Sequence, residues 1–123
     1  MVVVDTSVWI DHFRRASRQL TSLLEQDEVA MHPFVVGELA CGNLKNRKEI
    51  IALLHALPSV TKADDDEALF FIERHSLMGR GVGLIDVHIL ASCQIDSCSL
   101  WTKDKGLREI AQGMNIAFSQ PGA

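Results

Sequence analysis

The stretch Val2-Val3-Val4-Asp5-Thr6-Ser7 decides how the rest of the chain is interpreted. Its valines do not alternate with polar residues, which predicts a strand buried on both faces at the centre of a parallel sheet. Asp5 comes directly after this strand, so we expect its carboxylate at the strand's C-terminal end. Ligands of open α/β sheets bind at this edge. The stretch therefore marks a candidate site as well as a candidate fold.

Short apolar stretches alternate with helical periodicity along the remaining chain. We predict strands over residues 2–4, 29–31, 59–61, 98–102 and 116–118. We predict helices over residues 6–13, 17–26, 33–41, 47–57, 64–78, 84–94 and 104–112. This alternation is typical of an α/β fold in which a central, mostly parallel sheet of four to five strands is flanked by helices.

The length of 123 residues suits one domain. We expect that domain to span residues 1–119 and the last four residues, 120–123, to form a loose tail. Hydrophobic residues make up 47% and charged residues 23% of the chain, as in an ordinary globular protein. No segment approaches the roughly 20 apolar residues of a membrane helix, and the apolar run after Met1 is too short for a signal peptide. We therefore expect a cytoplasmic protein with no membrane partner.

The formal net charge is −4, whereas a protein that binds nucleic acid by bulk electrostatics is basic. A polyanion can bind here only through local basic patches or through cations that bridge acids and phosphates. The three cysteines show no paired metal-binding spacing, so we expect free thiols and no structural zinc.

Four acidic residues are candidates for one site: Asp5, Glu38, Asp86 and Asp104. Each has an ordinary alternative role. The two residues that follow apolar strands, Asp5 and Asp104, are also good N-caps of the next helix. Asp86 can complement a helix dipole, and Glu38 can be a solvated helical residue. However, Glu38 and Asp86 lie among apolar neighbours, where an unpaired charge is costly. We therefore expect all four at the same edge of the sheet.

Four carboxylates without a dedicated cationic partner suit hard cations that prefer oxygen ligands, namely Mg²⁺ or Mn²⁺. Such ions favour the attack of water on phosphorus and stabilise the leaving oxygen. Three hydroxyls can support the carboxylates or a phosphate, those of Thr6, Ser7 and Thr102.

These residues carry a family resemblance. The motifs, in order, are Val4-Asp5-Thr6-Ser7, Val36-Gly37-Glu38-Leu39, Leu84-Ile85-Asp86 with Ile89-Leu90-Ala91, and Leu100-Trp101-Thr102-Lys103-Asp104. Together they resemble the PIN domain, and most of all the VapC toxins of bacterial and archaeal toxin–antitoxin pairs. The similarity covers essentially the full length. It departs from the usual pattern at His32-Pro33, where an apolar stretch with Ser or Thr is commoner, and in the glycine-rich loop 79–83.

The resemblance implies an Mg²⁺- or Mn²⁺-dependent endoribonuclease, with Asp5, Glu38, Asp86 and Asp104 as its acidic quartet. It also implies a cognate antitoxin of the VapB type that blocks the site, and a homodimer. Three basic residues are candidate contacts to the RNA backbone, namely Arg14, Lys45 and Lys103. The ordinary alternative for them is solvated surface.

Two other functions are compatible with parts of the sequence. One is a binding scaffold that has kept the PIN fold without catalysis, although the complete set of four acids counts against it. The other is an aspartate-based phosphoryl-transfer domain. Such a domain needs a second acid close to Asp5, and Ser7 occupies the position two residues later.

Overall fold

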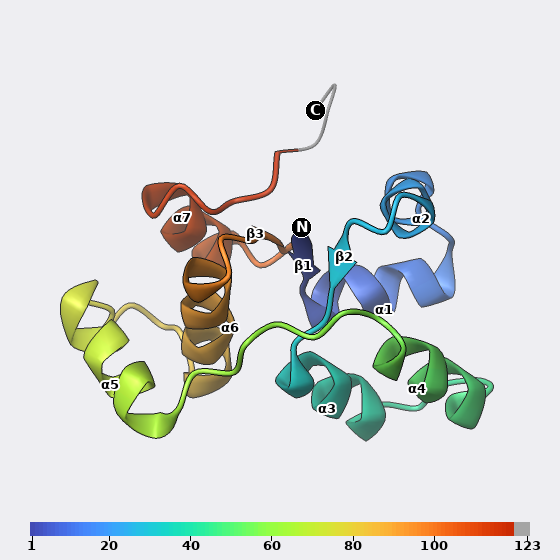
Figure 1. Ribbon diagram of the computed structural model, residues 1–123, viewed down its shortest axis with the longest axis horizontal. Helices are drawn as coiled ribbons and strands as arrows, with labels where there is room; N and C mark the ends of the chain where they lie inside the picture. Colours follow the sequence, from blue (N-terminus) through green and yellow to red (C-terminus); the bar gives the residue numbers. More distant parts are fainter. Residues whose placement is uncertain (120–123) are drawn as a thin grey trace.

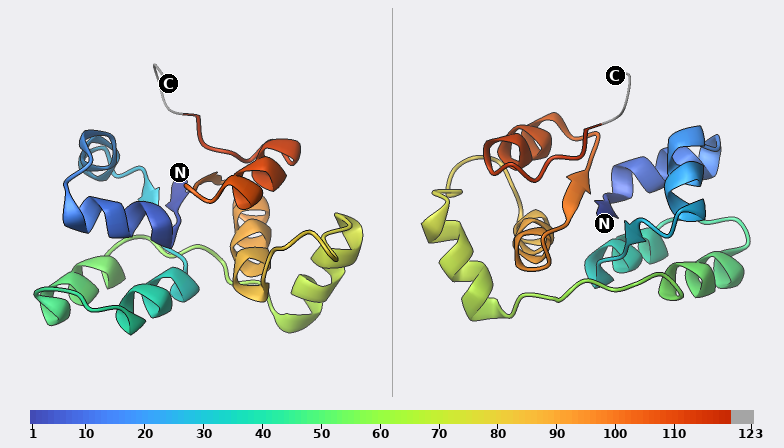
Figure 2. Two further views of the ribbon diagram at one scale, coloured as in Figure 1. Left: turned by 180° about the vertical axis from the view of Figure 1, so that it is seen from behind. Right: turned by 45° about the horizontal axis from the view of Figure 1, so that its top comes forward.

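The sheet lies at the centre of the molecule and separates two groups of helices (Figure 1). The computed structural model describes residues 1–119, so the expected tail 120–123 lies outside the described residues. Helices α1 to α4 gather on one side of the central strand and α5 to α7 on the other, and both rotated views in Figure 2 show the same division.

The valine stretch forms the middle strand, β1 (Val2–Val4). It pairs in parallel with β2 (Val29–Ala30) and with β3 (Ser99–Trp101), in the order β2-β1-β3. Val3 and Val4 have no solvent exposure, because neighbouring strands flank β1 and packed elements cover both faces of the sheet. The predicted α/β class, parallel pairing and central position of residues 2–4 are confirmed.

Each outer edge of this three-stranded sheet is extended by a single parallel bridge, within residues 1–119. Met31 pairs with Ser59, and Leu100 pairs with Ala117. The first bridge is held by bonds from Met31 N–H to the Pro58 carbonyl and from Val60 N–H back to Met31. The predicted strands 59–61 and 116–118 therefore lie at the two edges of the sheet, but each contributes a single bridge and not a continuous ladder.

The helices follow the predicted order. Their bounds are α1 Thr6–Arg14, α2 Arg18–Glu25, α3 Pro33–Cys41, α4 Arg47–His55, α5 Asp65–Arg74, α6 Leu84–Ile95 and α7 Lys105–Gly113. Local capping explains several starts. Ser17 accepts a bond from Leu20 N–H, and Asp64 and Glu67 form a capping box at α5.

Helix α5 ends four residues before the predicted end at residue 78. His75 is its C-cap, and Ser76 adopts a left-handed φ of 51°, which stops the helix despite the apolar residues that follow. Cys93 and Cys98 are buried free thiols, as expected. In the part of the chain that the structure describes, no helix is long and apolar enough to cross a membrane.

Candidate active site

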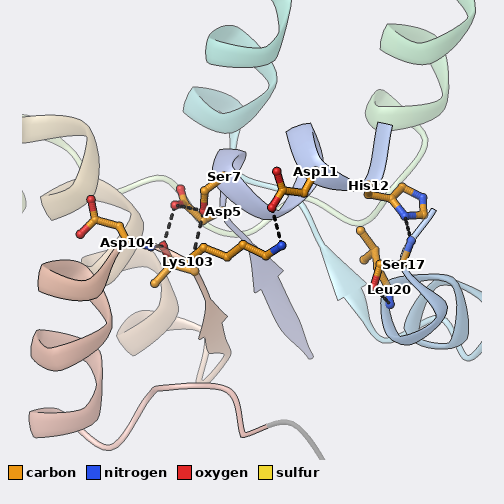
Figure 3. A network of polar contacts seen from close by, with 9 residues as sticks. Asp5, Ser7, Asp11, His12, Ser17, Leu20, Lys103 and Asp104 are labelled. Atoms are coloured by element: carbon orange, nitrogen blue, oxygen red, sulfur yellow. Dashed lines mark hydrogen bonds and ion pairs between the residues drawn. The ribbon is translucent and has the colours of Figure 1, made fainter. Parts of the chain in front are cut away.

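Asp5 occupies the junction between β1 and α1, at the C-terminal edge of the sheet. It is the N-cap residue of α1 by position, yet its side chain makes no capping hydrogen bond. Instead, its Oδ2 accepts bonds from the hydroxyls of Ser7 at 3.1 Å and Thr102 at 2.8 Å. The side chain is buried, with 7% exposure. The capping alternative for Asp5 is therefore wrong, and its carboxylate is oriented by hydroxyls, as Figure 3 shows for Ser7.

Thr102 links Asp5 to Asp104 at the end of β3. Its hydroxyl donates to Asp5 and accepts a 3.1 Å bond from the backbone N–H of Asp104. The Asp104 Oδ1 accepts a bond from Leu107 N–H and so caps α7. Asp104 therefore does serve as a cap, but this role uses one of its two carboxylate oxygens.

Glu38 approaches from α3. Its Oε1 accepts a 2.8 Å hydrogen bond from the Thr6 hydroxyl of α1. This bond joins α3 to α1 at the site. Glu38 is exposed, contrary to the expectation of an apolar environment. The apolar residues around it, among them Val35 and Leu39, point into the core, whereas Glu38 lies on another face of the helix.

Asp86 lies in the first turn of α6 and is partly buried. Burial raises the pKa of its carboxyl above the ordinary value, and the negative charges of Asp5 and Asp104 raise it further. Glu38 adds a smaller effect in the same direction, while a backbone hydrogen bond from Gly83 acts in the opposite one. The charges of the other three acids thus influence Asp86, although burial has the larger effect on its pKa.

The donor set fits a hard divalent cation, because all of its donor atoms are oxygens of carboxylates and hydroxyls. The carboxylates also repel one another, and a bound cation would relieve this repulsion. Within residues 1–119, no ion pair joins a lysine or arginine to any of the four acids. In the same residues, no three His, Cys, Asp or Glu side chains lie close enough together to hold a metal ion. The four acids therefore lie at one edge without surrounding a common point, and binding of a cation would have to draw them closer together.

The three predicted basic contacts lie around this edge. Arg14 and Lys45 line a groove of about 800 Å³ together with Glu38. Apolar residues, among them Ile10 and Phe13, also line it. Lys103 does not line this groove; its backbone N–H contacts Ser7, and its ammonium pairs with the Asp11 carboxylate of α1.

The sequence as a whole matches a family model for the PIN domain over residues 2–113. The chain belongs to the PIN-domain family. Ribonuclease VapC32 of Mycobacterium tuberculosis, known from strains CDC 1551 and H37Rv, is 39% identical to this PIN domain over 121 residues. Those residues are 98% of each chain. The resemblance to the VapC type is thereby confirmed.

Solved structures agree on the fold. FitAcB from Neisseria gonorrhoeae superposes on this PIN domain with a TM-score of 0.66 at 17% identity, covering 98% of each chain. PAE2754 from Pyrobaculum aerophilum does so with a TM-score of 0.62 at 14% identity, covering 91% of this chain and 80% of its own. At these identities the likeness concerns the fold alone.

Sequence reasoning missed Asp11 of this PIN domain. Its Oδ2 accepts a hydrogen bond from the Lys103 ammonium, which is the main reason that the pKa of Asp11 lies below its ordinary value. One signal was available, because Asp11 comes four residues after Ser7 and so lies on the same face of α1. Its partner, in contrast, is 92 positions away.

The histidine that departs from the family pattern has a structural role. His32 has no solvent exposure, and its Nδ1 accepts a 2.9 Å bond from Phe34 N–H at the start of α3. The helix that carries Glu38 is thus capped by an imidazole. Burial, together with the nearby His88 and Lys62, lowers the pKa of His32 to about 4.

Proposed function

We propose that this protein is a metal-dependent endoribonuclease, the toxin of a toxin–antitoxin pair, which hydrolyses RNA phosphodiester bonds at the carboxylate edge. One observation carries the proposal. Asp5, Glu38, Asp86 and Asp104 come from four separate parts of the chain to one edge, where hydroxyls hold Asp5 and Glu38 and the Thr102 hydroxyl links Asp5 to Asp104. The 39% identity to a ribonuclease over 98% of both chains supports RNA as the substrate.

The four carboxylates would hold Mg²⁺ or Mn²⁺. When bound, such an ion supplies the Lewis acidity that polarises a phosphodiester and favours attack of water on phosphorus. The oxygen-only donor set supports this ion class. Its ligands must be ionised, so protonation of Asp86 would oppose binding.

The hydroxyls keep the acids in position. Ser7 and Thr102 donate to the same oxygen of Asp5, which directs its other oxygen away from them. Thr6 holds Glu38 in the same manner. Each of these hydroxyls donates a hydrogen bond, so the carboxylate that it contacts is fixed in one orientation.

The groove beside Glu38 offers a path for the RNA strand. Arg14 and Lys45 line it and can neutralise backbone phosphates despite the net charge of −4. Lys103, which is next to Asp104 in the sequence, is a further candidate phosphate contact outside the groove lining. These contacts would position the strand without reading its sequence.

The partner would be a VapB-type antitoxin that blocks the site, and the active form would be a homodimer in the cytoplasm. The relationship to VapC32 supports the antitoxin partner. The neighbour FitAB, which has been determined bound to an IR36 DNA fragment, supports the fold with a TM-score of 0.60.

A cleavage assay on a mixture of structured and unstructured RNAs tests the function. Purified protein, freed of any copurifying antitoxin, is incubated with Mn²⁺ or with EDTA, and the cut positions are mapped. We expect discrete cuts with Mn²⁺ and none with EDTA. Cleavage that persists in EDTA, or no cleavage of any RNA by antitoxin-free protein, would contradict the proposal.

A further inference from the structure

The Lys103 side chain leaves the site in which its backbone lies. Lys103 stands between Thr102 and Asp104, and its backbone N–H donates a 3.1 Å bond to Ser7 Oγ, which itself donates to Asp5. Its ammonium, however, pairs with Asp11 on α1. Figure 3 shows the side chain extending toward Asp11 and away from Asp104.

The backbone of Lys103 is therefore anchored two hydrogen bonds from Asp5, and only the direction of its side chain is free. A lysine ammonium is a compact charge with three donors on a flexible stem. Such a charge would compete with a divalent ion for carboxylate oxygens if the side chain turned toward Asp5 and Asp104.

Asp11 offers an acceptor outside the group of four acids. The Asp11–Lys103 pair is half exposed, at 47% and 50% of the two side chains. Within residues 1–119 it is the one ion pair between a basic and an acidic side chain. An exposed pair adds little to folding stability. Its main effect is therefore to fix the position of the Lys103 ammonium.

We propose that Asp11 is a positioning residue that holds the Lys103 ammonium away from Asp5 and Asp104, which leaves their oxygens available to a divalent cation. The inference rests on the proposed metal-dependent function. Asp11 itself contacts neither the cation nor the RNA in this account, and it acts only through Lys103. An exposed pair is also easily opened, so an RNA phosphate can take over the ammonium once substrate arrives.

A double-substitution cycle tests this role through Mn²⁺ binding by the RNA-free, antitoxin-free full chain. Free Mn²⁺ is measured by electron paramagnetic resonance for wild type, Asp11→Asn, Lys103→Gln and the double variant. We expect Asp11→Asn to bind Mn²⁺ about two- to fivefold more weakly, the range that the loss of one exposed ion pair allows, because the released ammonium competes for the acids. The double variant should bind as tightly as Lys103→Gln.

The dependence on Lys103 separates this role from simple loss of negative charge. Asp11→Asn could weaken Mn²⁺ binding equally with Lys103 and with Gln at position 103, or in neither case. Either result would overturn the positioning role of Asp11 while leaving the metal site intact. Absence of Mn²⁺ binding by wild type would overturn the proposed function together with the role of Asp11. Glu25→Gln on α2 is the matched control for charge, and unchanged melting temperatures establish that each variant is folded.

Discussion

The Thr102 hydroxyl donates a 2.8 Å hydrogen bond to Asp5 across 97 positions of sequence, and both side chains are buried. The same hydroxyl accepts from Asp104 N–H. This one atom therefore joins the ends of β1 and β3 at the point where the acids gather.

Thr102→Val removes that hydroxyl while keeping the shape of the side chain. We expect it to lower the free energy of unfolding by about 1–3 kcal/mol, because buried polar groups lose their partner. We also expect weaker Mn²⁺ binding, since Asp5 loses its orientation. Thr102→Ser is the control that keeps the hydroxyl. Denaturant unfolding of both variants checks this, and equal stability of the Val and Ser variants would contradict it.

Asp86→Asn should stabilise the metal-free protein. The pKa of Asp86 is raised in the folded state, so at neutral pH its charge opposes folding, and this cost disappears as the pH falls through the raised pKa. Removing the charge should raise the melting temperature at pH 7 by about 2–5 °C. Added Mn²⁺ should stabilise wild type more than the variant. Thermal scans with EDTA and with Mn²⁺ measure both effects, and a lower melting temperature for metal-free Asp86→Asn would contradict the repulsion.

His32 should make the fold sensitive to acid. Its pKa is about 4 in the folded protein against an ordinary 6.5, so the unfolded chain takes up the proton first. Stability should therefore fall as the pH drops from about 6.5 toward 4, with a slope of up to about 1.4 kcal/mol per pH unit from this group. His32→Asn keeps an N-cap oxygen for Phe34 N–H but does not titrate. We expect a flatter pH dependence for the variant, and identical slopes would refute the assignment.

Arg14 and Lys45 should contribute to RNA affinity through phosphates. Arg14→Gln or Lys45→Gln should each weaken binding to all RNAs alike and reduce the slope of log K against log salt by about 0.7. Lys48→Gln, on the neighbouring exposed helix but outside the groove lining, is the matched control. Filter binding at several salt concentrations, with Ca²⁺ replacing Mn²⁺, measures the slopes. If Lys48→Gln weakened RNA binding as much as the groove variants do, the result would argue against RNA binding along the groove.

The sequence predicts the centre of this molecule well because local patterns determine it. Three consecutive valines specify the buried strand, and the acids directly after β1 and β3 then follow the strand ends to a common edge. The helical acids Glu38 and Asp86 were also placed at that edge, although the exposure of Glu38 was not predicted. Apolar neighbours in sequence do not reveal which face of α3 a residue occupies.

Features that depend on three-dimensional pairing were not predictable. The bond between Asp11 and Lys103 requires β1 and β3 to lie side by side, and no local pattern encodes it. The end of α5 at Arg74 depends on the left-handed backbone of Ser76. A glycine at this position would have indicated such a conformation, but a serine does not. The reduction of residues 59–61 and 116–118 to single bridges likewise depends on how these segments meet the sheet edges.

The most direct test of the central claim is cleavage of an end-labelled RNA by wild type and by Asp5→Asn with Mn²⁺. A matched RNA carries a 2′-deoxy sugar at the scissile nucleotide. Asn keeps an oxygen for Ser7 and Thr102, so the variant should fold. It should nevertheless lose at least about 100-fold in rate, because a charged ligand of the cation is gone. Wild type should cut both RNAs without forming a 2′,3′-cyclic phosphate, since water is the nucleophile. Wild-type rates for Asp5→Asn, or a block by the 2′-deoxy sugar, would contradict the account.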